Sequence, residues 1–289
     1  MAYIIYSDLA ADIAPEYARE NGIRFIPMRY SLGGEDRLCS AMEPEEVLHR
    51  FYEGQRKGDL TQTSQIPPQV YVDAFTPVLE QGDSVLYLSL SSGLSNTYNS
   101  SRVAAQELND RFGPGRVACV DSLGATGGMG LLLEWAVENR RAGMSLEENA
   151  AWLEKNRLRV CHLFMVEDLL YLKRGGRVSA ATAVVGTALN IKPILRIQGD
   201  GTLKNFAKAR GGKNAMLEML RIYDRTSDRD GRVIILHADS PEKAAFLEGE
   251  IRSRDPKCRI TVLMLSPIIG AHTGPGMCAL VYSGAREEG

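Results

Sequence analysis

The sequence predicts an α/β protein of two domains. The N-terminal domain is expected to have a doubly wound, mainly parallel sheet, and the smaller C-terminal α/β domain a mixed or antiparallel sheet. The chain has 289 residues, more than a single core usually supports. Its N-terminal half alternates strand-length apolar runs with helical patterns, whereas a hairpin signal enters the C-terminal half. We place the domains at residues 1–158 and 159–289.

In the N-terminal half, short apolar runs are separated by segments with helical periodicity. Strands separated by helices of this length imply parallel pairing in one sheet. The pattern Ser145-Leu-Glu-Glu148 is a capping box, which specifies where the last helix of this half begins. The expected strands are 3–7, 24–32, 85–90 and 117–121, and the expected helices are 44–53, 68–81, 94–112, 124–142 and 146–157.

The C-terminal half has a different pattern of predicted strands and helices. Gly199-Asp200-Gly201 between two apolar runs is a strong hairpin signal, so antiparallel pairing enters here. No long polar linker separates the halves, and we expect the crevice between closely packed domains to be the ligand site. The expected strands are 191–198, 202–209, 233–238, 259–265 and 278–282, and the expected helices are 212–226 and 241–254.

Composition and charge argue against several classes of protein. The formal net charge is −2, and acidic and basic residues are mixed along the chain. We therefore expect no nucleic acid partner and no stable membrane association. The start lacks the charged segment of a signal peptide, and no apolar run approaches the roughly 18 residues that span a bilayer. Five cysteines without CxxC spacing suit the reducing cytoplasm, where we expect the protein to reside.

A first hydroxyl-rich segment, residues 61–68, leads into a predicted helix and contains Thr63 and Ser64. A serine or threonine before a helix and a proline in its first turn are ordinary features of a helix start. Taken alone, this segment is explained by helix capping.

A second segment, residues 89–97, contains Ser92, Gly93, Ser95 and Asn96. It joins a predicted strand to a predicted helix, so free N–H groups and the positive end of a helix dipole meet there and favour an anion. Capping is the alternative, but five hydroxyl residues in nine exceed what a cap needs. This loop is therefore a candidate anion site.

A third segment, residues 269–276, contains His272, Thr273 and Gly274. A lone histidine is more often structural than functional. This one is bracketed by glycines and a proline, and we expect a rigid turn that aims its side chain. The remaining histidines lie within helix or strand patterns, and we assign them structural roles: His49, His162 and His237.

A fourth segment, residues 171–177, places three cations around a turn and ends at Arg177. Clustered lysine and arginine side chains are usually just solvated. The alternative is that they neutralise an anion at the mouth of a site.

Several enzyme motifs fail on inspection. The nucleophile elbow G-x-S-x-G is broken at Thr97, and the dinucleotide fingerprint that starts at Gly128 ends in a leucine. There is no phosphate loop, and no cysteine and histidine spacing suits zinc. We expect no cofactor, no metal and no catalytic residue.

Taken together, these segments resemble the DegV family, whose members bind fatty acids. The resemblance covers essentially the whole chain, and six motifs in the expected order make it specific. The matching motifs are Thr63-Ser-Gln65, Ser91-Ser-Gly-Leu-Ser95 with Thr97-Tyr98, Val120-Asp-Ser122, Asp168–Arg177, Leu189–Ile194 and Ile269–Gly276.

The resemblance implies a long-chain fatty acid whose tail lies in an internal tunnel between the domains. It implies that Thr63, Ser95 and the backbone amide of Asn96 hold the carboxylate, and that His272 and Arg177 complete the polar network. It also implies that a separate fatty acid kinase receives the bound acid, so this chain is a carrier without catalytic turnover. The residues expected to support the site are Ser64, Ser92, Gly93, Thr273 and Gly274.

Two alternatives stay open. One is an esterase or acyltransferase that uses Ser95 and His272, and the other is a sensor of a different carboxylated metabolite. The sequence also departs from the family pattern, because the segment 7–12 lacks the usual middle hydroxyls and Asn96 replaces a glycine. Ligand preference is therefore expected to differ from that of better-known relatives.

Overall fold

The computed structural model describes residues 2–179 and 190–286. Its N-terminal half is built on a four-stranded parallel sheet with the order β2-β1-β6-β7. Each strand carries the β-branched and aromatic residues that favour extended backbone, and β6 is buried along its whole length. The strands are β1 (Tyr3–Asp8), β2 (Arg24–Ile26), β6 (Ser84–Ser89) and β7 (Val117–Asp121).

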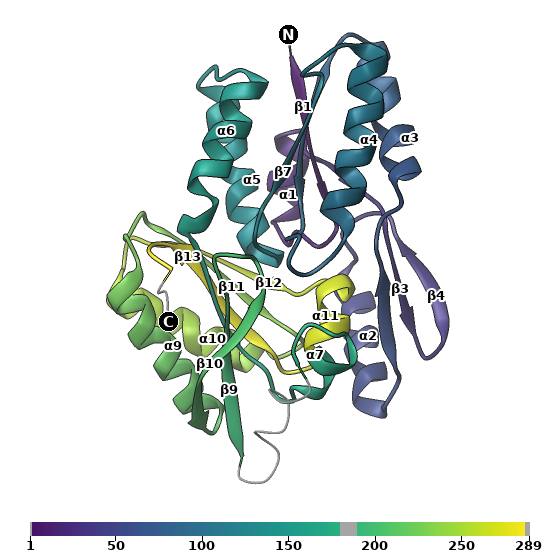
Figure 1. Cartoon of the computed structure of the whole chain (residues 1–289). Coiled ribbons are helices and arrows are strands. Elements are labelled where there is room, and N and C mark those ends of the chain that lie inside the picture. The colour runs from purple at the N-terminus through teal and green to yellow at the C-terminus, as the bar shows by residue number, and fades with distance from the viewer. Residues whose placement is uncertain (1, 180–189, 287–289) are drawn as a thin grey trace.

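Helices cover both faces of this sheet, which confirms the doubly wound prediction (Figure 1). The helices α3 (Pro68–Glu80) and α4 (Thr97–Phe112) lie on one face, and α5 (Thr126–Arg141) and α6 (Leu146–Asn156) lie on the other. The capping box at the start of α6 is confirmed, because the Glu148 amide donates to Ser145 Oγ and the Ser145 amide donates to Glu148. A short helix, α1 (Pro15–Glu20), follows β1.

The C-terminal half is built on a six-stranded mixed sheet with the order β10-β9-β8-β13-β11-β12. Only β11 and β12 pair in parallel, and the other pairs are antiparallel. The hairpin predicted at Gly199–Gly201 is confirmed. The strands are β8 (Val160–Met165), β9 (Ile191–Ile197), β10 (Leu203–Arg210), β11 (Arg232–His237), β12 (Arg259–Met264) and β13 (Cys278–Ser283).

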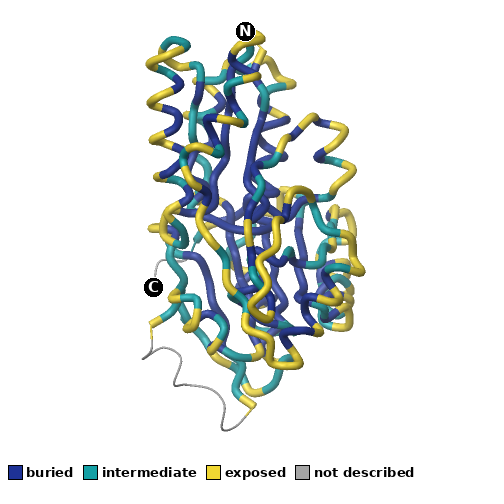
Figure 2. The backbone as a smooth tube through the Cα atoms, turned by 90° about the vertical axis from the view of Figure 1, so that its right-hand side faces the viewer, coloured by how far each residue is buried: buried dark blue, intermediate teal, exposed yellow. Residues whose placement is uncertain are grey.

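The two faces of the mixed sheet have different roles. One face packs against α9 (Gly212–Thr226) and α10 (Pro241–Arg254) around a separate apolar core. The other face belongs to the main core, where Leu236 and Val281 pack with residues of the parallel sheet. Buried residues therefore occupy the interior of both halves and the region between them (Figure 2).

Helix α5 lies between the two sheets and explains the glycine-rich stretch that fails as a nucleotide motif. A Cβ at Gly127 would meet Ile234 Cγ2 at 2.9 Å, and one at Gly130 would meet the backbone oxygen of Asp12 at 2.5 Å. These glycines let the helix approach both halves closely, so their role is packing.

Among the described residues, no helix is long and apolar enough to cross a membrane.

A small third sheet was not predicted. The expected strand 24–32 breaks at Pro27, which lacks an N–H to donate. Its second part, β3 (Met28–Leu32), joins an antiparallel sheet between β4 (Glu35–Cys39) and β5 (Thr61–Ser64), and α2 (Glu45–Lys57) packs against it. The hydroxyl-rich segment 61–68 is therefore partly an edge strand and not only a helix start.

One expected turn is wrong. The segment expected to form a rigid turn at 269–276 lies mostly in a short helix, α11 (Pro267–Thr273), because Pro267 occupies its first position and Gly274 ends it. The turn expected in the cationic segment 171–177 is confirmed, because Gly175 and Gly176 form it directly after the helix α7 (Leu170–Arg174). Leu189, which starts one of the family motifs, lies outside the described residues.

Candidate ligand-binding site

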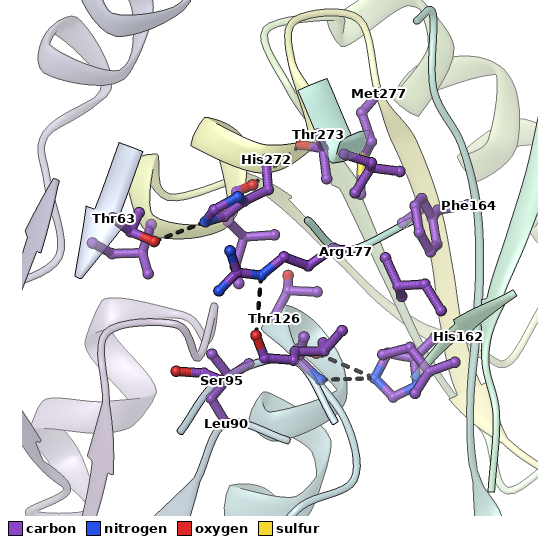
Figure 3. A pocket seen from close by; sticks show the side chains of 18 of the residues that line it. Thr63, Leu90, Ser95, Thr126, His162, Phe164, Arg177, His272, Thr273 and Met277 are labelled. Atoms are coloured by element: carbon purple, nitrogen blue, oxygen red, sulfur yellow. Dashed lines mark hydrogen bonds between the residues drawn. The ribbon is translucent and has the colours of Figure 1, made fainter. Parts of the chain in front are cut away.

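A cavity of about 210 Å³ lies between the carboxyl end of the parallel sheet and the inner face of the mixed sheet. The side chains of Thr63, Ser95, Arg177 and His272 lie at one side of it, and those of His162, Phe164 and Met277 lie at the other (Figure 3). None of the described residues that line the cavity is acidic. The apolar lining includes Met28, Leu90, Leu94, Leu172, Ile197, Leu203, Ile268, Ile269, Ala279 and Val281.

Strand β5 brings Thr63 to helix α11. Thr61 and Thr63 are two residues apart, so their side chains point to the same face of the strand. Thr61 Oγ1 donates to the carbonyl oxygen of Ala271 at 2.9 Å, and Thr63 Oγ1 lies 2.7 Å from Nε2 of His272. The edge strand is thus attached to the helix at two points, and the second of them joins two predicted site residues.

The imidazole of His272 is neutral at physiological pH. Burial, and secondarily the charge of Arg177, lower its pKa to about 4. Its Nδ1 has no hydrogen-bond partner within the described part of the chain. A neutral ring beside a hydroxyl provides polar contacts to a ligand without adding a second positive charge.

Arg177 supplies the one positive charge among the lining residues that the structure describes. Its Nε donates to the carbonyl oxygen of Leu94 at 3.0 Å, and its Nη1 donates to that of Gly175. Partial burial lowers its pKa. Because both of these partners are neutral carbonyls and no lining residue is acidic, the guanidinium charge is uncompensated within the cavity, and an anion is the ligand that would balance it.

The loop that follows β6 is held by a buried carboxylate. Asp8 Oδ2 accepts hydrogen bonds from the Leu90 amide at 2.9 Å and from the Tyr87 hydroxyl at 2.8 Å. Burial raises the pKa of Asp8, and these hydrogen bonds oppose the rise. The result is a fixed path for the backbone that carries Ser95.

At the start of α4, Ser95 Oγ accepts the amide of Thr97 at 3.2 Å and lies 2.9 Å from Thr97 Oγ1. Asn96 occupies the N-cap position but makes no side-chain cap. Its Oδ1 accepts a hydrogen bond from Asn99 Nδ2 at 2.8 Å, and the residue is exposed. The Asn96 side chain therefore lies at the surface of the loop.

The structure brings most of the predicted site residues to one cavity. Those that line it are Thr63, Ser64, Ser95, Asn96, Arg177, His272 and Thr273. Three others do not line it. The Ser92 amide donates to Asp121 Oδ1, Gly93 packs against Gly201, and Gly274 ends α11 with a positive φ of 73°.

The polar lining residues Gln65, Thr126 and His162 were not among the predicted site residues, and His162 was assigned a structural role. It lies on β8 two residues before Phe164, so the two side chains share the face that lines the cavity. Its Nε2 lies 3.2 Å from the carbonyl oxygen of Ala125, and burial lowers its pKa to about 3. The sequence placed His162 within a helix or strand pattern, but no bounds were predicted for a strand there, so the alternation was not used.

The arrangement does not form a nucleophile and base pair from Ser95 and His272. His272 Nε2 is bonded to Thr63, and Ser95 Oγ is bonded to Thr97. Within residues 2–179 and 190–286, no group of three or more histidine, cysteine, aspartate or glutamate side chains is placed to hold a metal ion. The geometry is that of a binding site with a polar end and an apolar interior.

Comparison with known proteins decides the family. The model of a family described as "Uncharacterised protein, DegV family" matches residues 3–285. The chain belongs to the DegV family. Among DegV proteins, a DegV domain-containing protein of Clostridium perfringens is 34% identical over 288 residues, which cover 99% of each chain.

Solved DegV structures share the fold. A DegV family protein from Thermus thermophilus, described as binding fatty acid, has a TM-score of 0.86 at 31% identity, over 98% of this chain and 100% of that one. The fatty acid kinase B3 protein of Streptococcus pneumoniae, loaded with linoleic acid, also has a TM-score of 0.86, over 98% of this chain and 99% of that one. At 21% identity, the second likeness is one of fold.

Proposed function

We propose that this DegV protein binds a long-chain fatty acid in the cavity, with the tail inside and the carboxylate at the polar end. The observation that carries the proposal is the uncompensated charge of Arg177 in a cavity whose remaining lining is neutral and mostly apolar. An acid with a long apolar tail satisfies both requirements at once. The fatty acid binding described for the Thermus thermophilus relative supports the same assignment.

The head group needs several polar partners, because an unpaired buried carboxylate is very costly. We propose that Thr63 and Ser95 donate to it, together with the amide of Asn96 at the start of α4. His272 orients Thr63 through the 2.7 Å contact, and Arg177 supplies the balancing charge. In this arrangement Ser64 and Thr273, which also line the cavity, support the polar end.

The tail accounts for most of the affinity. Burying a methylene contributes about 0.8 kcal/mol, so a chain of ordinary membrane length offers on the order of 10 kcal/mol before entropic costs. The buried side chains of Phe164 and Met277 line the inner part, where such a tail would lie. The carboxylate then determines the orientation of the bound fatty acid, and the tail determines how tightly it binds.

The test is direct. Protein purified without added lipid is denatured, extracted and examined by mass spectrometry, and we expect fatty acids of about C14–C18. Oleate or palmitate should also raise the melting temperature of delipidated protein. No extracted lipid and no stabilisation would overturn the proposal, and a short polar acid in the extract would assign the site to a different carboxylated metabolite.

We further propose that the chain does not transform the acid and presents it to a separate fatty acid kinase. Two observations support this. Ser95 and His272 are each bonded to another residue, and the exposed residues Ser64 and Asn96 line the polar end, so the cavity opens to the surface there. A partner enzyme would therefore meet the carboxylate first.

This second proposal is tested with ATP and hydroxylamine, which traps acyl phosphate as a hydroxamate. The loaded protein alone should give none, and a bacterial fatty acid kinase added to it should give hydroxamate that depends on both proteins. Hydroxamate formed by this chain alone would show that it is itself the catalyst.

A further inference from the structure

Gly175 lies directly against the imidazole of His272. A Cβ placed on Gly175 would lie 2.2 Å from His272 Nδ1 and 3.1 Å from its Cε1, far closer than a methyl group tolerates. The backbone of Gly175 has φ −72° and ψ −10°, a conformation that any residue adopts. Glycine is therefore required here by contact and not by backbone freedom.

The next residue provides the contrast. Gly176 has a φ of 74°, in the left-handed region that favours glycine, but nothing lies within 4 Å of the Cβ position. Glycine is thus favoured at the two adjacent positions for different reasons, and only Gly175 touches the site. The carbonyl oxygen of Gly175 also accepts the hydrogen bond from Arg177, so one residue contacts both the imidazole and the cation.

Helix α11 is packed closely against two tyrosine side chains. A Cβ at Gly270 would lie 2.4 Å from the Tyr52 hydroxyl, and one at Gly274 would lie 2.4 Å from the Tyr171 ring. Since Tyr171 belongs to α7, the ends of α7 and α11 interlock, with a glycine of each against a ring of the other. A methyl group at position 175 therefore displaces the imidazole and leaves the helix in place.

We infer that Gly175 is a positioning residue for the carboxylate-binding end, because its bare Cα holds the imidazole of His272 in the orientation that bonds Thr63. The inference rests on the proposed function. Rotating the ring by the amount that a methyl group demands breaks the 2.7 Å contact with Thr63 Oγ1. The hydroxyl of Thr63 is then free to turn away from the ligand.

The test compares Gly175→Ala with Gly199→Ala. Gly199 has an ordinary φ and nothing within 4 Å of its Cβ position, so it controls for the substitution itself. Binding of oleate to delipidated protein is measured by calorimetry. Gly175→Ala should weaken binding about tenfold or more, the effect of one lost hydrogen bond, and Gly199→Ala should bind like the parent.

A double-mutant cycle separates positioning from general damage. In a His272→Ala background, Gly175→Ala should cause no further loss, because the ring that it displaces is gone. Equal losses in both backgrounds would overturn the inference. So would an unchanged affinity of Gly175→Ala, whereas a parent protein that binds no oleate would instead overturn the proposed function.

A readout without ligand completes the experiment. The ¹⁵N resonances of the His272 ring should shift in Gly175→Ala and stay unchanged in Gly199→Ala. An unchanged ring spectrum in Gly175→Ala would contradict the contact, whatever the binding data show.

Discussion

Thr63 Oγ1 lies 2.7 Å from His272 Nε2, although 209 residues separate them in the chain. Thr63 stands on the edge strand of the small third sheet, and His272 stands in the last turn of α11. Neither residue has a function by itself. Their contact joins two elements at the polar end of one cavity, where both side chains line the space that a carboxylate would occupy.

Removing the two hydroxyls should weaken fatty acid binding. Thr63→Val combined with Ser95→Ala removes two groups that can donate to the carboxylate, and each lost hydrogen bond costs roughly 1–3 kcal/mol. Calorimetry with oleate measures the loss. Thr76→Val is a matched control in α3, because the Thr76 hydroxyl is buried without a partner in the described structure. Equal affinity of the double mutant and the parent would remove both hydroxyls from the site.

Removing the charge of Arg177 should change the preference between ligands. Arg177→Met keeps much of the side-chain volume and removes the cation that no lining residue compensates. We expect binding of the fatty acid to weaken by roughly 1.5–3 kcal/mol, the range for a hydrogen bond to a charged group. Binding of the corresponding fatty alcohol should hardly change. A parallel loss for acid and alcohol would show that the arginine acts through packing alone.

The depressed pKa of His272 predicts a pH dependence of stability. Its pKa is about 4 in the folded chain and near 6.5 when unfolded, so the unfolded chain binds more protons between these values. The contribution of His272 to the free energy of unfolding is fully present above pH 6.5 and is lost as the pH falls toward 4. This contribution amounts to about 3 kcal/mol.

Urea unfolding of the parent and of His272→Asn over pH 4.5–7.5 measures this contribution. The stability of the parent should fall relative to that of the variant as the pH decreases. A constant difference between the two proteins would show that the imidazole is not desolvated as the structure indicates.

Asp12 predicts a dependence of the opposite sign. Burial raises its pKa to about 6, while its Oδ1 accepts the amide of Ser266 at 2.9 Å. The folded chain therefore binds more protons between pH 3.8 and 6, and stability falls by about 3 kcal/mol as the pH rises through that window. The loss is complete above pH 6.

Asp12→Asn keeps an oxygen acceptor for Ser266 and removes the buried charge. At pH 8 the variant should be at least as stable as the parent, and at pH 4.5 its relative advantage should shrink. Urea unfolding at the two pH values is the measurement. A variant that is much less stable than the parent at pH 8 would assign the Asp12 charge a stabilising role, which contradicts this account.

Part of the fold and of the site could be predicted from the sequence. Strands of the parallel sheet are dense in β-branched and aromatic residues, and the hairpin at Gly199–Gly201 has an unambiguous turn signal. The loop 89–97 was recognised because its hydroxyls and helix start suit an anion, and His272 because glycines and a proline flank it, whereas the role of Thr63 was implied by the family resemblance. Seven of the predicted site residues line the cavity.

Other features left no local signal. The four residues of β5 have no apolar alternation, and they form a strand because β3 lies alongside to accept their hydrogen bonds. The segment 267–273 is too short and too rich in glycine and proline to be recognised as a helix, and contacts with Tyr52 and Tyr171 stabilise it. His162 was assigned a structural role because it lies within a helix or strand pattern, and only the packing of β8 makes its side chain part of the cavity lining.

The sequence by itself determined the class of fold, the order of most elements and the chemical character of the candidate site, because periodicity, caps and residue type act over a few neighbouring residues. Only the tertiary structure decided that Thr63 meets His272, that Arg177 has no acidic neighbour among the described lining residues, and that Gly175 lies directly against the imidazole. These are contacts between distant segments. They depend on how buried faces pack, and packing at the density of a protein interior is specified by the whole chain at once.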